Sequence, residues 1–288
     1  MFRASAVRMS AGTALVALGL WQGATSASAT ATPAPPRWII SQTAVSLLGQ
    51  AGLTKAQLQT LFGSRRAYLT GTTTAPLVSG ALRTVTFTSY QTMEKQLAGP
   101  GLPAGTTAVL YDNEDWSLTP AAEQRDPAKY EELAAKLAHA HHLLFISTPA
   151  TDLTDVLAPT QSDHYAAYLR LGLAASAARY ADVIDIQAQG SEASLGKFTS
   201  FVKAAAAQAR GANPHVIVLA GLSTNPSGQH VTSAQFTSAD NAVRPDVNGY
   251  WLNIPAQGSA CPRCGTPQPK VAVSLLQMLA RSAAHAVR

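Results

Sequence analysis

Two acidic residues follow a short apolar run, Ala108 to Tyr111, and their spacing is the clearest sign of chemistry in this chain. Side chains alternate along a β-strand, so Asp112 and Glu114 share one face and lie about 7 Å apart along the strand. Burying two such groups costs free energy unless they serve a purpose. A carboxylate raises the pKa of a neighbouring carboxylic acid, which keeps that acid protonated near neutral pH. We therefore expect Glu114 to act as a general acid with Asp112 as its partner.

The chain alternates short β-branched or aromatic runs with Ala/Leu-rich stretches, as α/β proteins do. Eight candidate strands without a long structureless gap favour a closed TIM-type (βα)8 barrel. The first two strands are weak, and losing one would leave an open doubly wound α/β sheet instead. In a barrel, Asp112 and Glu114 would lie at the catalytic, C-terminal ends of the strands. The candidate strands are Trp38–Ser41, Ala67–Thr70, Thr84–Tyr90, Ala108–Glu114, Leu143–Thr148, Asp182–Gln189, His215–Leu222 and Tyr250–Ile254, and the clearest helices are Lys129–His139, Tyr165–Arg179, Leu195–Arg210 and Val271–Ala286.

Several candidate strands have one apolar face, suited to a covering helix, and one polar face. This pattern predicts a hydrophilic pocket in the upper part of the barrel. The residues expected to bind a substrate there offer aromatic surface or amide groups; they are Tyr90, Trp116, Gln187, Gln189, Asn225, Trp251 and Asn253. The roles of Asp115, of Glu192 and of the deeper Asp185 stay open.

Other catalytic groups are scarce on the candidate strands. None of the seven lysines lies on one, which argues against Schiff-base chemistry. No histidine precedes His139, so the early-strand histidines of metal hydrolase barrels are missing. His164 and His230 fall in loops at the catalytic end, where either could join the acids around a metal, but no spacing assigns them one. The tract from Asp112 to Pro120 also fits a calcium-binding loop loosely, without the glycine of an EF-hand. We expect neither a metal nor a cofactor.

The first 29 residues have the pattern of a secretory signal peptide. Arg3 and Arg8 form a basic region, residues 11–20 are apolar, and residues 27–29 (Ala-Ser-Ala) form a small-residue cleavage site. The apolar stretch, about ten residues, is shorter than the roughly 20 needed to span a bilayer. The sequence therefore predicts a secreted protein with no membrane association after cleavage.

The remaining chain predicts one domain. Residues 30–36 form a Pro-rich spacer, and residues 37–288 suit a single barrel, which typically takes about 250 residues. Without Arg3 and Arg8, 19 basic side chains face 16 acidic ones, a net charge of +3 that is scattered along the chain. No basic run is interleaved with aromatic residues, so we expect no nucleic-acid binding, and we expect a monomer.

Cys261 and Cys264 are the only cysteines. A Cys-x-x-Cys pair can be a redox motif, but a redox pair sits at the start of a helix, whereas Pro262 and Gly265 favour a loop. Zinc would need two further ligands from elsewhere. In a secreted chain, the pair predicts a local disulfide.

The chain resembles family 18 glycoside hydrolases, the chitinase-type barrels, at a few positions. That family carries Asp-x-Asp-x-Glu at the end of strand four, a Gln or Tyr signature on strand six and a Trp on strand eight. The matching residues here are Asp112 and Glu114, Gln187 and Gln189, and Trp251. The resemblance implies that Glu114 is the acid and that Asp112 orients an acetamido group of the substrate. Leu110 replaces the first Asp of the motif, and strand six carries no Tyr.

These observations favour a secreted glycoside hydrolase that acts on a polar carbohydrate. Two other classes stay open. One is a secreted barrel that binds a sugar or another small polar ligand without hydrolysing it. The other is a lyase, isomerase or cyclase that uses the same acid pair. Strand seven ends without an acid, so a retaining enzyme with carboxylates on strands four and seven is disfavoured unless Glu192 supplies the second group.

Overall fold

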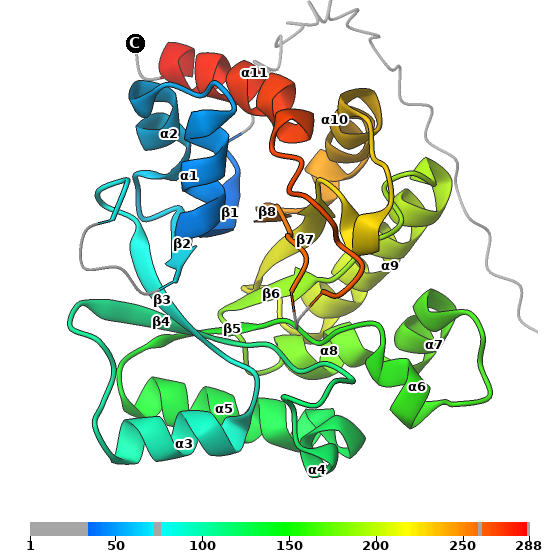
Figure 1. Cartoon of the computed structure of the whole chain (residues 1–288). Helices are drawn as coiled ribbons and strands as arrows, with labels where there is room; N and C mark the ends of the chain where they lie inside the picture. Colours follow the sequence, from blue (N-terminus) through cyan, green and yellow to red (C-terminus); the bar gives the residue numbers. More distant parts are fainter. Residues whose placement is uncertain (1–33, 72–75, 259–260, 287–288) are drawn as a thin grey trace, which may run out of the picture. The chain divides into compact units, whose positions relative to one another are not determined.

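The chain forms a closed barrel of eight parallel strands, seen in a computed structural model that describes residues 34–71, 76–258 and 261–286. The strands hydrogen-bond in sequence order, and β8 pairs with β1 to close the ring (Figure 1). They are β1 (Arg37–Ser41), β2 (Ala67–Thr70), β3 (Leu82–Phe87), β4 (Thr106–Tyr111), β5 (Leu144–Ser147), β6 (Val183–Ile186), β7 (Ile217–Ser223) and β8 (Gly249–Asn253). The predicted TIM-type barrel is thus confirmed. The predicted signal peptide and residues 30–33 of the spacer lie outside the described residues.

Helices connect the strands on the outside of the barrel (Figure 1). They are α1 (Gln42–Gln50), α2 (Lys55–Phe62), α3 (Tyr90–Ala98), α4 (Ala121–Arg125), α5 (Pro127–Ala140), α6 (Leu153–Leu157), α7 (His164–Leu171), α8 (Leu173–Ala178), α9 (Leu195–Ala212), α10 (Ser233–Val243) and α11 (Lys270–Ala286). Short 3-10 helices span Pro226–Gly228 and Arg244–Asp246. The described part of the β2–β3 connection contains no helix. None of the helices in the ranges given above is long and apolar enough to cross a membrane.

Local sequence signals set several helix ends. Thr54 and Thr232 each precede a helix and form a capping box. The Thr hydroxyl accepts from the backbone N–H of a Gln three residues later, and the side chain of that Gln accepts from the backbone N–H of the Thr. The predicted helix Tyr165–Arg179 is wrong as a single element. Gly172 adopts a left-handed conformation (φ 65°, ψ 34°), which ends α7 and starts α8.

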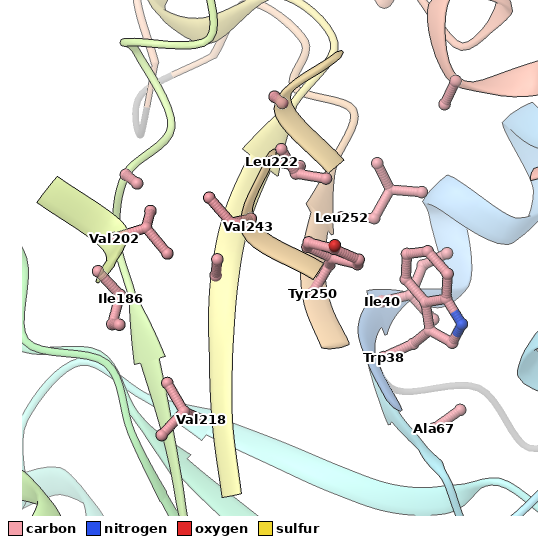
Figure 2. Close-up of a cluster of buried hydrophobic side chains, with 14 of the residues drawn as sticks. Trp38, Ile40, Ala67, Ile186, Val202, Val218, Leu222, Val243, Tyr250 and Leu252 are labelled. Atoms are coloured by element: carbon pink, nitrogen blue, oxygen red, sulfur yellow. The ribbon is translucent and has the colours of Figure 1, made fainter. Parts of the chain in front are cut away.

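Two apolar layers hold the barrel together. Inside it, alternate strand residues such as Ile39, Leu110 and Leu219 form a buried plug. Outside it, the opposite strand faces pack against the helices. Figure 2 shows part of this outer layer, where Trp38 and Tyr250 lie side by side with ring centroids 5.7 Å apart. The inner plug fills the lower lumen, and the polar groups gather toward the C-terminal ends of the strands.

Three predicted strands extend too far at their C-terminal ends. β3 ends at Phe87 rather than Tyr90, β4 at Tyr111 rather than Glu114, and β6 at Ile186 rather than Gln189. The main chain of Asp112 still donates to Phe87 O (2.8 Å), so Asp112 keeps its place in the alternation although it lies just beyond the strand. The polar residues thus belong to the loops that leave the barrel.

The predicted disulfide between Cys261 and Cys264 is present. Gly258 and Cys261 also pair through their backbones in a small antiparallel bridge. The disulfide therefore closes a tight loop in the segment between β8 and α11.

Glu131 on α5 makes stability depend on pH. It is 1% exposed, and burial raises its pKa to about 8, an effect that the Ser147 hydroxyl offsets only in part. The native protein keeps this proton after the unfolded chain has lost it at its ordinary pKa of about 4.3. The free energy of unfolding should therefore fall as the pH rises from about 4.5 to about 8. Urea unfolding of Glu131→Gln at the two ends of this range should show a smaller fall than the wild type.

The matched control is Glu132→Gln, which changes a partly exposed neighbour on the same helix whose pKa is lowered through its hydrogen bonds from Lys136 and Tyr180. This variant should keep the wild-type loss of stability toward high pH. An unchanged fall in Glu131→Gln would show that Glu131 is not the group responsible.

Candidate active site

Polar side chains from the ends of β4, β5 and β6 meet above the apolar plug. Asp112 directly follows β4 and is 7% exposed. Its Oδ1 accepts hydrogen bonds from Thr148 Oγ1 (2.7 Å) and Gln187 Nε2 (3.0 Å). The structure thus brings Asp112 and Gln187 together from two strands.

Gln187 links the two predicted acids through one amide group. Its Nε2 donates to Thr148 O (2.8 Å) and Asp112 Oδ1 (3.0 Å), and it lies 3.4 Å from Glu114 Oε1. Glu114 is only partly buried, whereas Asp112 is buried. Asp112 is therefore the inner carboxyl group, and Glu114 is the one that a ligand at the barrel mouth can reach.

The two carboxyl groups have different affinities for protons. Burial raises the pKa of Asp112 to about 6, and the hydrogen bonds from Thr148 and Gln187 limit the rise. Burial raises the pKa of Glu114 further, to about 9, because the charges of Asp112 and Asp152 add to it. Near neutral pH, Glu114 therefore holds a proton while Asp112 is mainly ionised. Such a pair can donate a proton to a bound ligand and stabilise positive charge beside it.

Two members of the site were missed from the sequence. Thr148 follows β5, and strand alternation from Ile146 would have placed it on the inner face. Asp152 lies in the next loop and accepts from the backbone N–H of Asp115 (3.0 Å). Burial raises the pKa of Asp152, and its charge acts on both Asp112 and Glu114. Asp152 follows no periodic pattern, so only the fold reveals its position.

A second set of polar groups, Asp185 and Gln189, adjoins Gln187. Asp185, in the middle of β6, is fully buried, and the charge of Asp112 adds to the effect of burial in raising its pKa. Gln189 Nε2 donates to Gln187 Oε1 (3.2 Å). Gly221 on β7 makes room for both side chains: a β-carbon there would lie 1.8 Å from Gln189 Oε1 and 3.4 Å from Asp185 Oδ2. The strand-seven glycine is thus part of the site.

The predicted aromatic and amide residues occupy varied positions. Trp251 on β8 is partly buried and packs against the inner plug. Asn253 follows it on the same strand and is also partly buried. Trp116 lies in the loop after β4, where its indole N–H donates to Thr119 Oγ1 (2.8 Å).

Tyr90 and Asn225 have partners other than the acid pair. Tyr90 begins α3; its ring packs against Tyr130 on α5, and its hydroxyl donates to Glu94 (2.6 Å). Asn225 is buried, and its Nδ2 donates to Cys264 O at 2.8 Å, with carbonyls of Pro255 and Thr266 also in range. Asn225 therefore fastens the disulfide loop instead of facing the lumen.

Glu192 links two segments at the barrel mouth through hydrogen bonds. Its carboxylate accepts from the backbone N–H groups of Gly190 and Ser223, both at 2.7 Å. Burial raises its pKa to about 7, against the opposing effect of these bonds. Both carboxylate oxygens serve to join the loop after β6 to the end of β7.

An open polar groove of about 310 Å³ is lined by residues that follow β5 and β6, and neither Asp112 nor Glu114 is among them. It runs between the loops after β5 and β6 and the start of α7. Lys197, on the first turn of α9, is held over the ring of Tyr165 at 4.8 Å, and His164 pairs with Asp155 (3.4 Å). The lining residues are Thr151, Ser162, His164, Tyr165, Gly190, Ser191, Ser194 and Lys197. His164 thus lines this groove. Among the described residues, no cluster of three or more His, Cys, Asp or Glu side chains could hold a metal ion.

Comparisons with known proteins assign no family. No family model matches the chain, and no curated protein matches it. One similar solved structure is a "putative alpha-L-fucosidase" from Bacteroides thetaiotaomicron VPI-5482, with TM-score 0.41, 8% identity, and coverage of 66% of this chain and 60% of that one. Another is a variant of the carboxyl transferase domain of Rhizobium etli pyruvate carboxylase with pyruvate, with TM-score 0.40, 11% identity, and coverage of 86% and 48%. The chain spans less than two thirds of either protein, and likenesses this low carry no argument about its activity.

Gly221→Ala tests the packing of Gln189 and Asp185 against β7. The new methyl group would overlap the end of the Gln189 side chain, so Gln189 must turn away from β7 and lose its hydrogen bond to Gln187, and we expect a loss of about 0.5–1.5 kcal/mol in the free energy of unfolding. Gly211→Ala is the control, because a β-carbon there meets nothing within 4 Å on α9 and alanine favours a helix. Chemical denaturation measures both. A Gly221→Ala protein as stable as the wild type would contradict the described packing.

Proposed function

We propose that this protein is a secreted glycoside hydrolase in which Glu114 is the general acid and Asp112 its carboxylate partner. The observation that carries the proposal is the Gln187 amide, which spans two carboxyl groups whose pKa values are raised to about 6 and about 9. Glycoside hydrolysis needs a carboxylic acid to protonate the leaving oxygen and a group to stabilise the oxocarbenium-like centre. Glu114 and Asp112 have the protonation states for these two tasks.

The division of labour follows from burial. Glu114 is the more accessible group, so it meets the glycosidic oxygen and donates its proton. Asp112 is held by Thr148 and Gln187 and remains a fixed negative charge. In line with the resemblance to family 18 enzymes, Asp112 orients an acetamido group of the substrate, so that this group assists the reaction. No carboxyl group at the end of β7 is then required.

The surroundings suit a hydroxyl-rich ligand. The groove lined by the loops after β5 and β6 offers hydroxyl and backbone groups for hydrogen bonds. Trp251 adds a partly exposed aromatic surface of the kind on which sugar rings pack. Secretion rests on the signal-peptide pattern, and the Cys261–Cys264 disulfide suits an oxidising compartment.

The pH dependence of kcat/KM tests the assignment of the two acids. Activity should fall below about pH 6, where Asp112 takes up a proton, and above about pH 9, where Glu114 loses one. In Asp112→Asn, the negative charge that helps to raise the pKa of Glu114 is gone. The alkaline limb of its residual activity should therefore move to lower pH. An alkaline limb that stays in place would show that Asp112 does not act on the proton donor.

A panel of polysaccharides and aryl glycosides, N-acetylated sugars included, tests the reaction itself. Purified wild type should release reducing ends, and Glu114→Gln should lose roughly 100-fold or more, as expected on removal of a general acid. Asp115→Asn is the matched control, because Asp115 is an exposed neighbour of Glu114, and its rate should stay within about threefold of wild type.

The absence of turnover on any sugar, with the proteins folded, would overturn the hydrolase. If sugars still bound, and bound equally well to Glu114→Gln, the protein would belong to the non-hydrolytic binding class.

A further inference from the structure

Three buried side-chain oxygens around Gln187 have no hydrogen-bond donor among the described residues. They are both carboxyl oxygens of Asp185 and Oε1 of Gln189. Asp185 is fully buried and lies on the inner face of β6, two residues before Gln187. Buried polar atoms without partners are rare in native proteins, so this cluster calls for a physical explanation.

The orientation of each of the two amide groups, Gln187 and Gln189, is set by the acceptor that it faces. Thr148 O is a carbonyl and can only accept, so Gln187 must direct its Nε2 toward it. Gln187 Oε1 then faces Gln189 and can only accept, so Gln189 must offer its Nε2. It follows that Gln189 Oε1 points away from Gln187 and needs a donor of its own.

Gly221 brings this oxygen and Asp185 to the same place. The point that a β-carbon of residue 221 would occupy lies 1.8 Å from Gln189 Oε1 and 3.4 Å from Asp185 Oδ2. Two buried acceptor oxygens therefore border the same space, which the missing side chain leaves open. A single hydrogen atom between the two oxygens would satisfy both.

We infer that Asp185 is protonated and donates its hydrogen to Gln189 Oε1, which makes it the positioning residue that holds Gln187 between Asp112 and Glu114. The effect on catalysis rests on the proposed hydrolase function, whereas the proton on Asp185 does not. Burial and the charge of Asp112 both raise the pKa of Asp185, in agreement with a neutral group. An ionised Asp185 would instead place a second uncompensated charge beneath Asp112.

Two substitutions of Asp185 separate a donor from a mere space filler. In Asp185→Leu the donor is lost and Gln189 is free to turn, so kcat should fall roughly tenfold, the worth of about one hydrogen bond, with KM within about threefold. In Asp185→Asn the Nδ2 group can donate to Gln189 Oε1, so the conservative variant should recover most of the lost rate. Equal kcat in wild type and Asp185→Leu, or a loss in Asp185→Asn as large as in Asp185→Leu, would overturn the inference.

Infrared spectroscopy measures the proton without turnover. The spectrum of the wild type minus that of Asp185→Asn at neutral pH should contain a protonated-carboxyl C=O band. That band should shift in Gln189→Leu, because the acceptor of the Asp185 hydrogen is removed. A carboxylate band in its place, or a band that Gln189→Leu leaves unchanged, would refute the hydrogen bond even if Asp185→Leu failed to fold.

The infrared band and the activity on sugars test the two proposals independently. A protein with the expected infrared band but no activity on any sugar would disprove the hydrolase and leave the protonated Asp185 established. A protein that hydrolyses sugars without the band would keep its proposed function and lose this inference.

Discussion

The carbonyl group of Thr148 is the constraint on which the polar interior depends. Because a carbonyl can only accept, it turns Gln187 into a donor toward β4 and β5, and Gln187 in turn joins Asp112 to Glu114. If the Gln187 amide were turned over, its oxygen would face the carboxylate oxygen of Asp112, and two acceptors would meet in a buried space without a hydrogen bond. The backbone of the barrel thus determines the polarity of a side-chain network above it.

The apolar plug and the network have complementary roles. The plug excludes water from the lower lumen, and this exclusion makes the carboxyl groups above it hard to ionise. The network then distinguishes among them, because Asp112 receives two hydrogen bonds while Glu114 receives one long contact. The pKa values of the two acids differ because Asp112 receives more hydrogen bonds and because the charges of Asp112 and Asp152 both act on Glu114.

Sequence periodicity was sufficient to predict the barrel and the inner face of β4 and β6, because those depend on local alternation. Asp112, Gln187 and Trp251 could be placed on that basis. Contacts between distant segments could not be predicted from periodicity. Asn225 has the character of a ligand-binding amide, yet its partners lie 30 to 41 residues further along the chain. Tyr90 lies at a strand-to-loop boundary, where the chain turns into α3 and the ring leaves the lumen. Gly221 has no side chain to reveal its role, and its importance lies in what it allows its neighbours to do.

The disulfide loop behaves differently from most cross-links. Cys261 and Cys264 are three residues apart, so their bond restricts the unfolded chain very little. Its influence is therefore on the shape of the folded loop, whose Cys264 carbonyl is held by Asn225 at the end of β7. Reduction would leave the barrel intact and loosen only this part of the rim. The redox state of the surroundings is thus coupled to the local order of the barrel mouth rather than to the survival of the fold.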